Sequence, residues 1–275
     1  MATAKPPVPV TPDDLVKGLA RAFAGALIFG LPMLMTSELW ELGARLDRLR
    51  LALLVVLAIP LLVGVAHRAG FEPTFGWRED LRDAALALSV GLLGSGTILL
   101  LFNHLGTPAS LDQVVGRIAI QAVPAALGAL LARNQLRGGG GGDGPRAFGG
   151  YFGTLFMMLV GALFLSFNMA PTEEMLLVAF AMTPCHGICL VVFSLGVTHL
   201  FVRVHGNRSG RSNVPAWSDF LLYSLPGYGL ALAISLFTLW VFGRLDGFGV
   251  GIALMATVVL AFPATLGAAA ARMIL

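Results

Sequence analysis

A ten-residue block occurs twice in this chain, first as Pro124-Ala-Ala-Leu-Gly-Ala-Leu-Leu-Ala-Arg133 and again as Pro263-Ala-Thr-Leu-Gly-Ala-Ala-Ala-Ala-Arg272. Seven of the ten positions are identical. A second set recurs in the same order: Gly25, Ala26, Leu27, Met33, Thr36 and Glu38 return as Gly161, Ala162, Leu163, Met169, Thr172 and Glu174. Gly25 precedes Pro124 by 99 residues, and Gly161 precedes Pro263 by 102. Two matched sets at nearly equal spacing predict one structural unit used twice.

The composition predicts an integral membrane protein. The chain of 275 residues is 57% hydrophobic and only 12% charged, with a mean hydropathy of +0.83. An ordinary soluble domain has about 25% charged residues. Apolar runs of about 20 residues, the length that crosses a hydrocarbon layer of ~30 Å, recur along the whole sequence.

These runs predict an all-α bundle of about eight transmembrane helices. They are continuous, unlike the alternating strands of about ten residues in a membrane β-barrel. The predicted spans lie near residues 18–40, 49–66, 83–105, 113–133, 150–169, 172–202, 218–242 and 248–272. Four spans in each repeat give both repeats the same orientation. We therefore expect a pseudo-two-fold axis along the membrane normal, with any shared pathway between the halves.

The predicted organisation has four parts: a cytoplasmic tail (1–17), a first repeat (18–136), a Gly-rich cytoplasmic linker (137–148) and a second repeat (149–275). The span at 172–202 is longer than a bilayer requires and contains Pro184. We expect its first turns to form a separate short helix at the outer surface. The amphipathic stretch 37–48 predicts the same in the first repeat.

The charges predict the orientation of the chain. The net charge is +3 and the pI about 9.2, but the positive residues lie at span ends and form no basic domain, so we expect no nucleic-acid partner. With the N-terminus inside, thirteen Lys and Arg residues are cytoplasmic and five are outside. The outer five are Arg45, Arg48, Arg50, Arg117 and Arg244. The positive-inside rule then places both termini in the cytoplasm.

A repeated Thr-x-Glu pattern predicts a cation-attracting mouth. Thr36 and Glu38 correspond to Thr172 and Glu174, with Glu173 beside them, at the outer ends of the first and fifth spans. Carboxylates at equal depth around a pore mouth concentrate cations and replace part of their hydration. The alternative is that these residues only cap helix starts.

Two polar residues of the fourth span have no polar counterpart in the second repeat. Arg117 lies near the outer end, with Gln121 one turn deeper, whereas Ala256 and Leu260 stand at the matching positions. Arg117 is a candidate partner for a mouth glutamate or an anion. The alternative is an arginine that extends to the aqueous interface.

His186 is the candidate that we place deepest, between Cys185 and Cys189 in the sixth span. Three soft ligands of this kind suit zinc or copper, but the spacing does not match the usual zinc pairs. Buried cysteines beside a hydrogen-bonded histidine are the alternative, so we predict no metal.

None of the 15 Asp and Glu residues falls in the middle of a predicted span, which favours a channel or facilitator over an ion-coupled transporter. A solute site would then use neutral polar groups. The candidates are Asn168, Ser95, Thr97, Thr183, Tyr223, Ser224, Tyr228 and Ser235.

The repeated block puts small residues on one helix face, where Gly128 and Gly267 allow close approach of backbones. Together with Gly247-x-x-x-Gly251, this predicts the interface between the repeats. The chain has no phosphate loop, nucleophile triad or catalytic carboxylate pair, so we expect neither an enzyme nor a cofactor.

Three blocks resemble a known family: Gln121-Ala-Val-Pro-Ala-Ala-Leu-Gly-Ala-Leu-Leu-Ala-Arg133, Phe167-Asn-Met-Ala-Pro-Thr-Glu-Glu174 and Thr36-Ser-Glu-Leu-Trp-Glu41. From about residue 15 to 275 the chain resembles a bacterial family of integral membrane proteins known only as a domain of unknown function. The resemblance implies the bacterial inner membrane. It also implies a small companion membrane protein as a partner. It implies no activity, and a homo-oligomer stays open.

Three functions remain open. The first is a channel or facilitator for a small solute, with cations slightly preferred because of the outer glutamates. The second is a secondary transporter with its site between the repeats. The third is a non-transporting assembly or sensor subunit that binds the companion protein or a lipid-soluble ligand. A polar path between the halves favours the first two, and a dry interface with an apolar groove favours the third.

The first hypothesis predicts that cation flux depends on the paired glutamates. In proteoliposomes, the double variant Glu38→Gln/Glu174→Gln is expected to pass monovalent or divalent cations more slowly than the wild type, because the mouth loses two negative charges. Absence of flux for every cation, with both proteins equally folded, would remove the cation channel from consideration.

Overall fold

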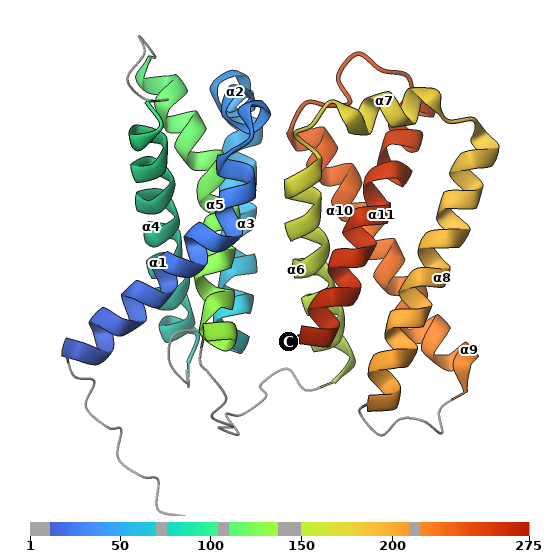
Figure 1. Cartoon of the computed structure of the whole chain (residues 1–275), viewed down its shortest axis with the longest axis horizontal. Coiled ribbons are helices and arrows are strands. Elements are labelled where there is room, and N and C mark those ends of the chain that lie inside the picture. Colours follow the sequence, from blue (N-terminus) through green and yellow to red (C-terminus); the bar gives the residue numbers. More distant parts are fainter. Residues whose placement is uncertain (1–11, 70–75, 104–109, 137–149, 209–214, 275) are drawn as a thin grey trace, which may run out of the picture.

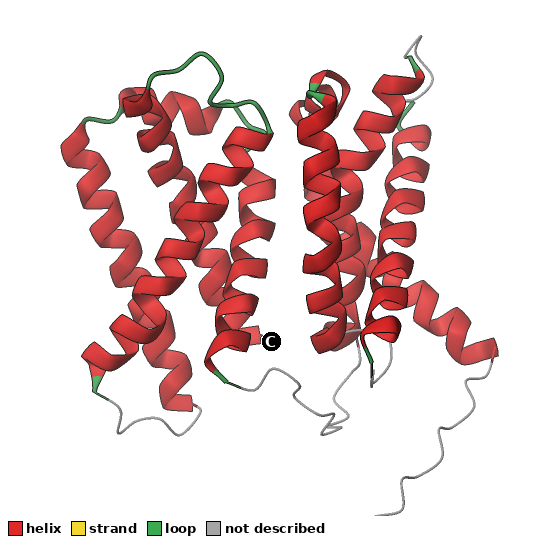
Figure 2. Ribbon diagram, turned by 180° about the vertical axis from the view of Figure 1, so that it is seen from behind, coloured by secondary structure: helices red, strands yellow, loops and turns green. Residues whose placement is uncertain are grey.

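The computed structural model describes residues 12–69, 76–103, 110–136, 150–208 and 215–274. The described residues form helices and connecting loops, without strands, so the predicted all-α fold is confirmed (Figures 1 and 2). Of the predicted tail, residues 1–11 lie outside these ranges, and residues 12–17 are helical; the predicted Gly-rich linker (137–148) lies wholly outside them.

The first half contains five helices. They are α1 (Pro12–Leu34), α2 (Ser37–Arg45), α3 (Arg48–Ala69), α4 (Trp77–Leu101) and α5 (Leu111–Leu136). The second half contains α6 (Tyr151–Met169), α7 (Glu174–Ala181), α8 (Pro184–Arg208), α9 (Ala216–Asp219), the π-helix η1 (Phe220–Ser224), α10 (Leu225–Val241) and α11 (Val250–Ile274).

Among the described residues, seven helices have the length and hydropathy to cross a membrane, and α1 with α2 makes an eighth candidate. The axes of α1 and α2 differ by 87°, so α2 is a separate short helix. The helix α7 is its counterpart in the second half. Both predicted short helices are therefore confirmed, and they lie at the same end of the bundle, called here the α2/α7 end (Figure 1).

Each half is organised around its last long helix. In the first half α5 packs against α1, α2, α3 and α4, and in the second half α11 packs against α6, α7, α8 and α10. The order of long and short helices is also the same in both halves, which is the order that a duplicated unit predicts. The symmetry axis that relates the halves stays a prediction.

The repeated small-residue block does not lie between the halves, contrary to the sequence prediction. A Cβ added at Gly128 of α5 would meet the carbonyl oxygen of Gly25 in α1 at 2.6 Å, within the first half. Gly267 of α11 and Gly161 of α6 are in equally close backbone contact within the second half. The block therefore joins the first and last long helices of its own repeat, where two backbones need to approach closely.

The predicted Gly247-x-x-x-Gly251 packing motif is also wrong. Gly247 lies in the loop before α11 with φ +82°, a conformation that favours glycine. A Cβ at Gly251 would meet no atom within 4 Å. Gly247 allows the turn into α11, and neither glycine packs against another helix.

The two halves meet through apolar side chains. The rings of Phe29 in α1 and Phe164 in α6 are in edge contact, with centroids 5.2 Å apart. A Cβ at Gly64 in α3 would come within 2.6 Å of the Phe156 ring in α6. One continuous cluster of buried apolar residues spans both halves.

The close contact between Gly161 and Gly267 predicts that one added methyl group lowers the stability of the fold. Gly161→Ala is expected to lower the free energy of unfolding by about 1–3 kcal/mol, because the added Cβ overlaps the backbone of α11. Thermal unfolding in detergent, followed by tryptophan fluorescence, measures the change. Gly196→Ala on α8 is the control, since its Cβ meets nothing within 4 Å. Equal midpoints for the two variants would contradict the proposed packing.

Candidate functional site

The α2/α7 end repeats one hydrogen-bond pattern in both halves. The hydroxyl of Thr36 donates to the carbonyl of Met33, and the hydroxyl of Thr172 donates to the carbonyl of Met169, each at 2.9 Å. Each threonine follows the end of the first long helix of its half, and neither makes a side-chain cap to the next helix. Both hydroxyls are therefore satisfied by the preceding turn.

Three predicted carboxylates converge on one arginine at this end. Burial lowers the pKa of the Arg244 guanidinium, whereas the charges of Glu173, Glu38 and Glu174 raise it. Glu38 belongs to the first half and the other residues to the second, so the repeated glutamates do come within electrostatic range of a common point. Sequence reasoning missed Arg244, because nothing in its local sequence distinguishes it from the other arginines at span ends.

A second arginine ties the halves together at the same end. Arg50 of α3 donates two hydrogen bonds to Asp246, at 2.7 and 3.0 Å, and a third to the carbonyl of Trp240 at 3.1 Å. Its guanidinium carbon also lies 5.4 Å from the centre of a Trp240 ring. Two parallel bonds to one carboxylate fix an orientation as well as a distance. The α2/α7 end of the joint between the halves is therefore closed by paired charges.

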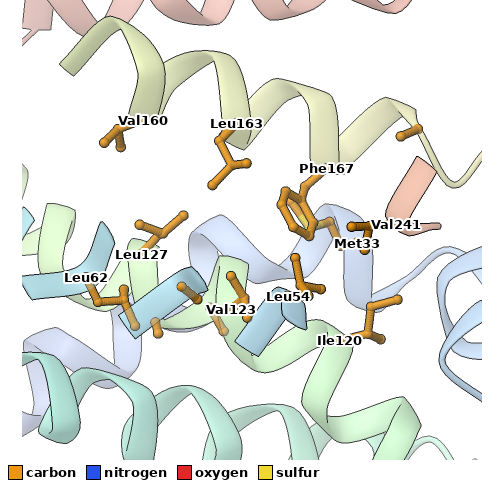
Figure 3. Packing of buried hydrophobic residues seen from close by; sticks show 14 of the residues in the cluster. Met33, Leu54, Leu62, Ile120, Val123, Leu127, Val160, Leu163, Phe167 and Val241 are labelled. Atoms are coloured by element: carbon orange, nitrogen blue, oxygen red, sulfur yellow. The ribbon is translucent and has the colours of Figure 1, made fainter. Parts of the chain in front are cut away.

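Below these charges the joint contains an apolar cavity of about 230 Å³. Figure 3 shows several of the side chains around it, contributed by both halves. Residues that line it come from α3, α5, α6 and α10, and all are apolar: Leu54, Leu57, Ala58, Leu61, Val123, Leu159, Leu163, Phe167, Ile234 and Phe237. A cavity with such a lining stays dry. Leaving about 230 Å³ empty costs on the order of 5 kcal/mol at ~24 cal/mol per Å³.

The cavity opens sideways, toward the bilayer. Leu57 is 45% exposed although it lines the cavity, and its neighbour Val56 is 59% exposed. Its α3 lining residues Leu54 to Leu61 lie about 9–20 Å along the helix axis from Arg48, at ~1.5 Å per residue. This range is the middle of a hydrocarbon layer of ~30 Å.

The predicted polar residues elsewhere are dispersed. Asn168 donates to the carbonyl of Phe164 at 2.8 Å, within its own helix. Arg117 is half-buried on α5, and Gln121 one turn away is 1% exposed, with no hydrogen-bond partner for its amide among the described residues. The matching residues Ala256 and Leu260 are fully buried, so this polar pair occurs in one half only.

The structure corrects the deep position predicted for His186. Since proline has no N–H and suits a first helical turn, α8 begins at Pro184, and His186 lies exposed in its first turn. Its Nδ1 is 2.7 Å from the hydroxyl of Thr183. Cys185 and Cys189 are exposed rather than buried. Among the described residues, no group of three His, Cys, Asp or Glu side chains is placed to hold a metal.

Two buried carboxylate pairs at the opposite end were missed by sequence reasoning. Asp80 Oδ2 lies 2.8 Å from His67 Nδ1, and Asp219 Oδ2 lies 3.2 Å from Arg203 Nη1. Each aspartate is only 3% exposed. Each pair joins the second long helix of a half to the start of the third. A signal was present, because the two aspartates are separated by the same 139 residues as the repeated ten-residue block.

The π-helix marks a length difference between the halves. Asp80 precedes Phe102 by 22 residues, and Asp219 precedes Phe242 by 23. Both phenylalanines end their helix with nearly the same backbone angles, φ −79° and ψ 4° against φ −77° and ψ 2°, and each is followed by a residue with positive φ. The second half therefore has one extra residue, and it is this half that contains the five-residue η1.

Comparison with known families agrees with this architecture. A family model described as "Putative integral membrane protein (DUF2391)" matches residues 18–275. Neither the curated proteins nor the solved structures gave a match to the chain. Because the family model covers both halves and every described span, the chain belongs to this family of integral membrane proteins.

Proposed function

We propose that this protein is a non-transporting membrane subunit that binds an acyl chain of a bilayer lipid between its two halves. The observation that carries the proposal is the apolar cavity of about 230 Å³ in the joint. Both halves line it, and no polar side chain is among its lining residues. This is the dry interface with an apolar groove that favours a ligand-binding subunit over a pore.

The depth of the cavity in the membrane indicates which kind of ligand it binds. Its mouth at Leu57 opens at the depth where hydrocarbon chains are the surrounding medium. A water molecule in this cavity would find no hydrogen-bond partner in the lining. A lipid chain that enters fills the void without losing a hydrogen bond, and it gains van der Waals contacts with the lining that an empty cavity lacks.

A lipid bound in this cavity would change how the two halves pack against each other. The halves contact each other mainly through apolar side chains and are linked at the α2/α7 end by Arg50 and Asp246. An occupied cavity favours the closed arrangement of the halves, and an empty one leaves the void. The companion membrane protein implied by the family resemblance would be the partner that reads this arrangement.

The orientation belongs to the same proposal. We place the α2/α7 end outside a bacterial inner membrane and both termini in the cytoplasm. The support is the excess of Lys and Arg at the opposite end.

Filling the cavity is expected to displace the lipid. Ala58 lines the cavity and is 4% exposed, so Ala58→Phe places a ring in the void. Native mass spectrometry of detergent-released protein should show a retained lipid on the wild type and at least a tenfold smaller lipid-bound fraction on the variant. Ala52→Phe is the matched control, because Ala52 is exposed on the same helix.

Ile234→Phe fills the cavity from the opposite wall and guards against a folding defect in one variant. Each variant must first show a cooperative thermal transition. Equal lipid retention in the wild type and both filled variants, or no retained lipid in any of them, would refute the proposal.

The convergence of three carboxylates on Arg244 supports a cation pathway as a second candidate. At low ionic strength, Arg244→Gln is then expected to raise cation flux into proteoliposomes by roughly fivefold, since a unit charge about 4 Å away is worth about 1 kcal/mol in water. Arg45→Gln, an exposed arginine of α2, is the control. A flux unchanged by Arg244→Gln would count against this candidate.

A further inference from the structure

The core of the second half contains buried hydroxyl groups that the described part of the chain does not satisfy. Four of them are at most 3% exposed and have no hydrogen-bond partner among the described residues: Ser166, Tyr228, Ser235 and Thr265. Other buried hydroxyls behave differently. Thr238 and Thr257 each donate to the carbonyl four residues earlier, at 2.7 Å. An unpaired buried hydroxyl is unfavourable, so four in one core require an explanation.

Two of the four hydroxyls lie on helices that pack against each other, Ser166 on α6 and Ser235 on α10. Gly227 of α10 lies directly against Met158 of α6, and one turn further on Ala162 and Ala231 belong to the same buried cluster. The helices α6 and α10 run in the same direction (Figure 1). One more turn brings Ser166 and Ser235 to the same level on the facing sides of the two helices, because residues four apart share a helix face.

The other two hydroxyls come from the helices around this contact. Tyr228 lies on α10, two turns before Ser235 and so on nearly the same face. Thr265 lies on α11, next to Ala264 of the same buried cluster. The helices α6, α10 and α11 all pack against one another. The four hydroxyls therefore lie on three helices that pack against one another.

The first half shows that this packing does not need most of the hydroxyls. With the one-residue insertion in η1 taken into account, Ser235 corresponds to Ser95, which is likewise buried without a partner. The other three correspond to Gly30, Leu88 and Ala126. The second half therefore has three extra hydroxyls at positions that the first half fills without polar groups.

The π-helix lies next to this polar core. Ser224, its last residue, is fully buried one turn before Tyr228, and its hydroxyl lies 3.0 Å from Nδ1 of His199. A π-helical turn inside an α-helix often marks a functional site. Polar groups therefore continue from Tyr228 toward the end of the bundle that contains Asp219.

We propose that the core of the second half binds a small uncharged hydrogen-bonding molecule between Ser166, Ser235 and Tyr228. Hydroxyls both donate and accept, so they match such a molecule. The apolar side chains of the same contact, Met158, Ala162, Ala231, Ala264 and Ala268, offer no countercharge to an ion. Water and a small polar solute share the required chemistry. The proposal rests on these hydroxyls and does not depend on the acyl-chain cavity, whose lining residues are all apolar.

Hydroxyl deletion tests the site. Ser166→Ala, Ser235→Ala and Tyr228→Phe are each expected to lower the unfolding midpoint in detergent by several degrees, because they remove a bond to the bound molecule. Thr257→Val is the control, since its hydroxyl bonds only to its own helix. Midpoints that stay unchanged or rise in all three variants would overturn the proposal, because deletion of an unpaired buried hydroxyl is neutral or stabilising.

Equilibrium dialysis of the detergent-solubilised protein identifies the molecule. Binding of labelled urea or glycerol that Tyr228→Phe abolishes would assign a polar solute to the site. Absence of binding of either solute, together with the lowered midpoints, would assign water. Both results support the site, and the midpoints alone decide whether it exists.

Discussion

The fold depends on the close approach of two backbones within each half. In the second half Gly161 and Gly267 touch, and in the first half Gly128 lies against Gly25. Helices inside a bilayer gain little from the hydrophobic effect, because the lipid is as apolar as they are, so dense packing has to hold them together. The glycine contacts bring the first and last long helices of each half into register. The remaining helices then pack around the last one.

Charge is confined to the two ends of the molecule. At the α2/α7 end Arg50 and Asp246 join the halves, and at the opposite end Asp80 and Asp219 are paired within them. A buried charge is tolerable only with a partner, and the middle of a bilayer offers none. The joint between the halves is correspondingly apolar over its central part. The protein therefore combines three features: the Arg50–Asp246 ion pair at the α2/α7 end, the apolar joint between the halves, and the buried hydroxyls of the second half.

The sequence was a good guide to elements and a poor guide to contacts. The spans, both short helices and the correspondence of Glu38 with Glu174 followed from hydropathy and repetition. The partner of the small-residue block could not be predicted, because a glycine face indicates close packing without naming the neighbour. His186 was misplaced because its depth was judged for a continuous span over 172–202, although Pro184 already indicated the break that the structure shows. The long-range charge partners depend on the tertiary arrangement.

The extra residue in the second half shows how two halves with the same order of helices can differ in their interiors. A residue inserted into an α-helix would turn everything after it by about 100° and carry its buried face away from the core. The five-residue π turn absorbs the insertion within Phe220–Ser224, so Ser235 still faces inward like Ser95. Within this helix the change of register is confined to the turn, whereas Ser166 and Thr265 lie on other helices. The second half thus has a more polar interior, while this helix keeps an inward-facing serine at the level where the first half has Ser95.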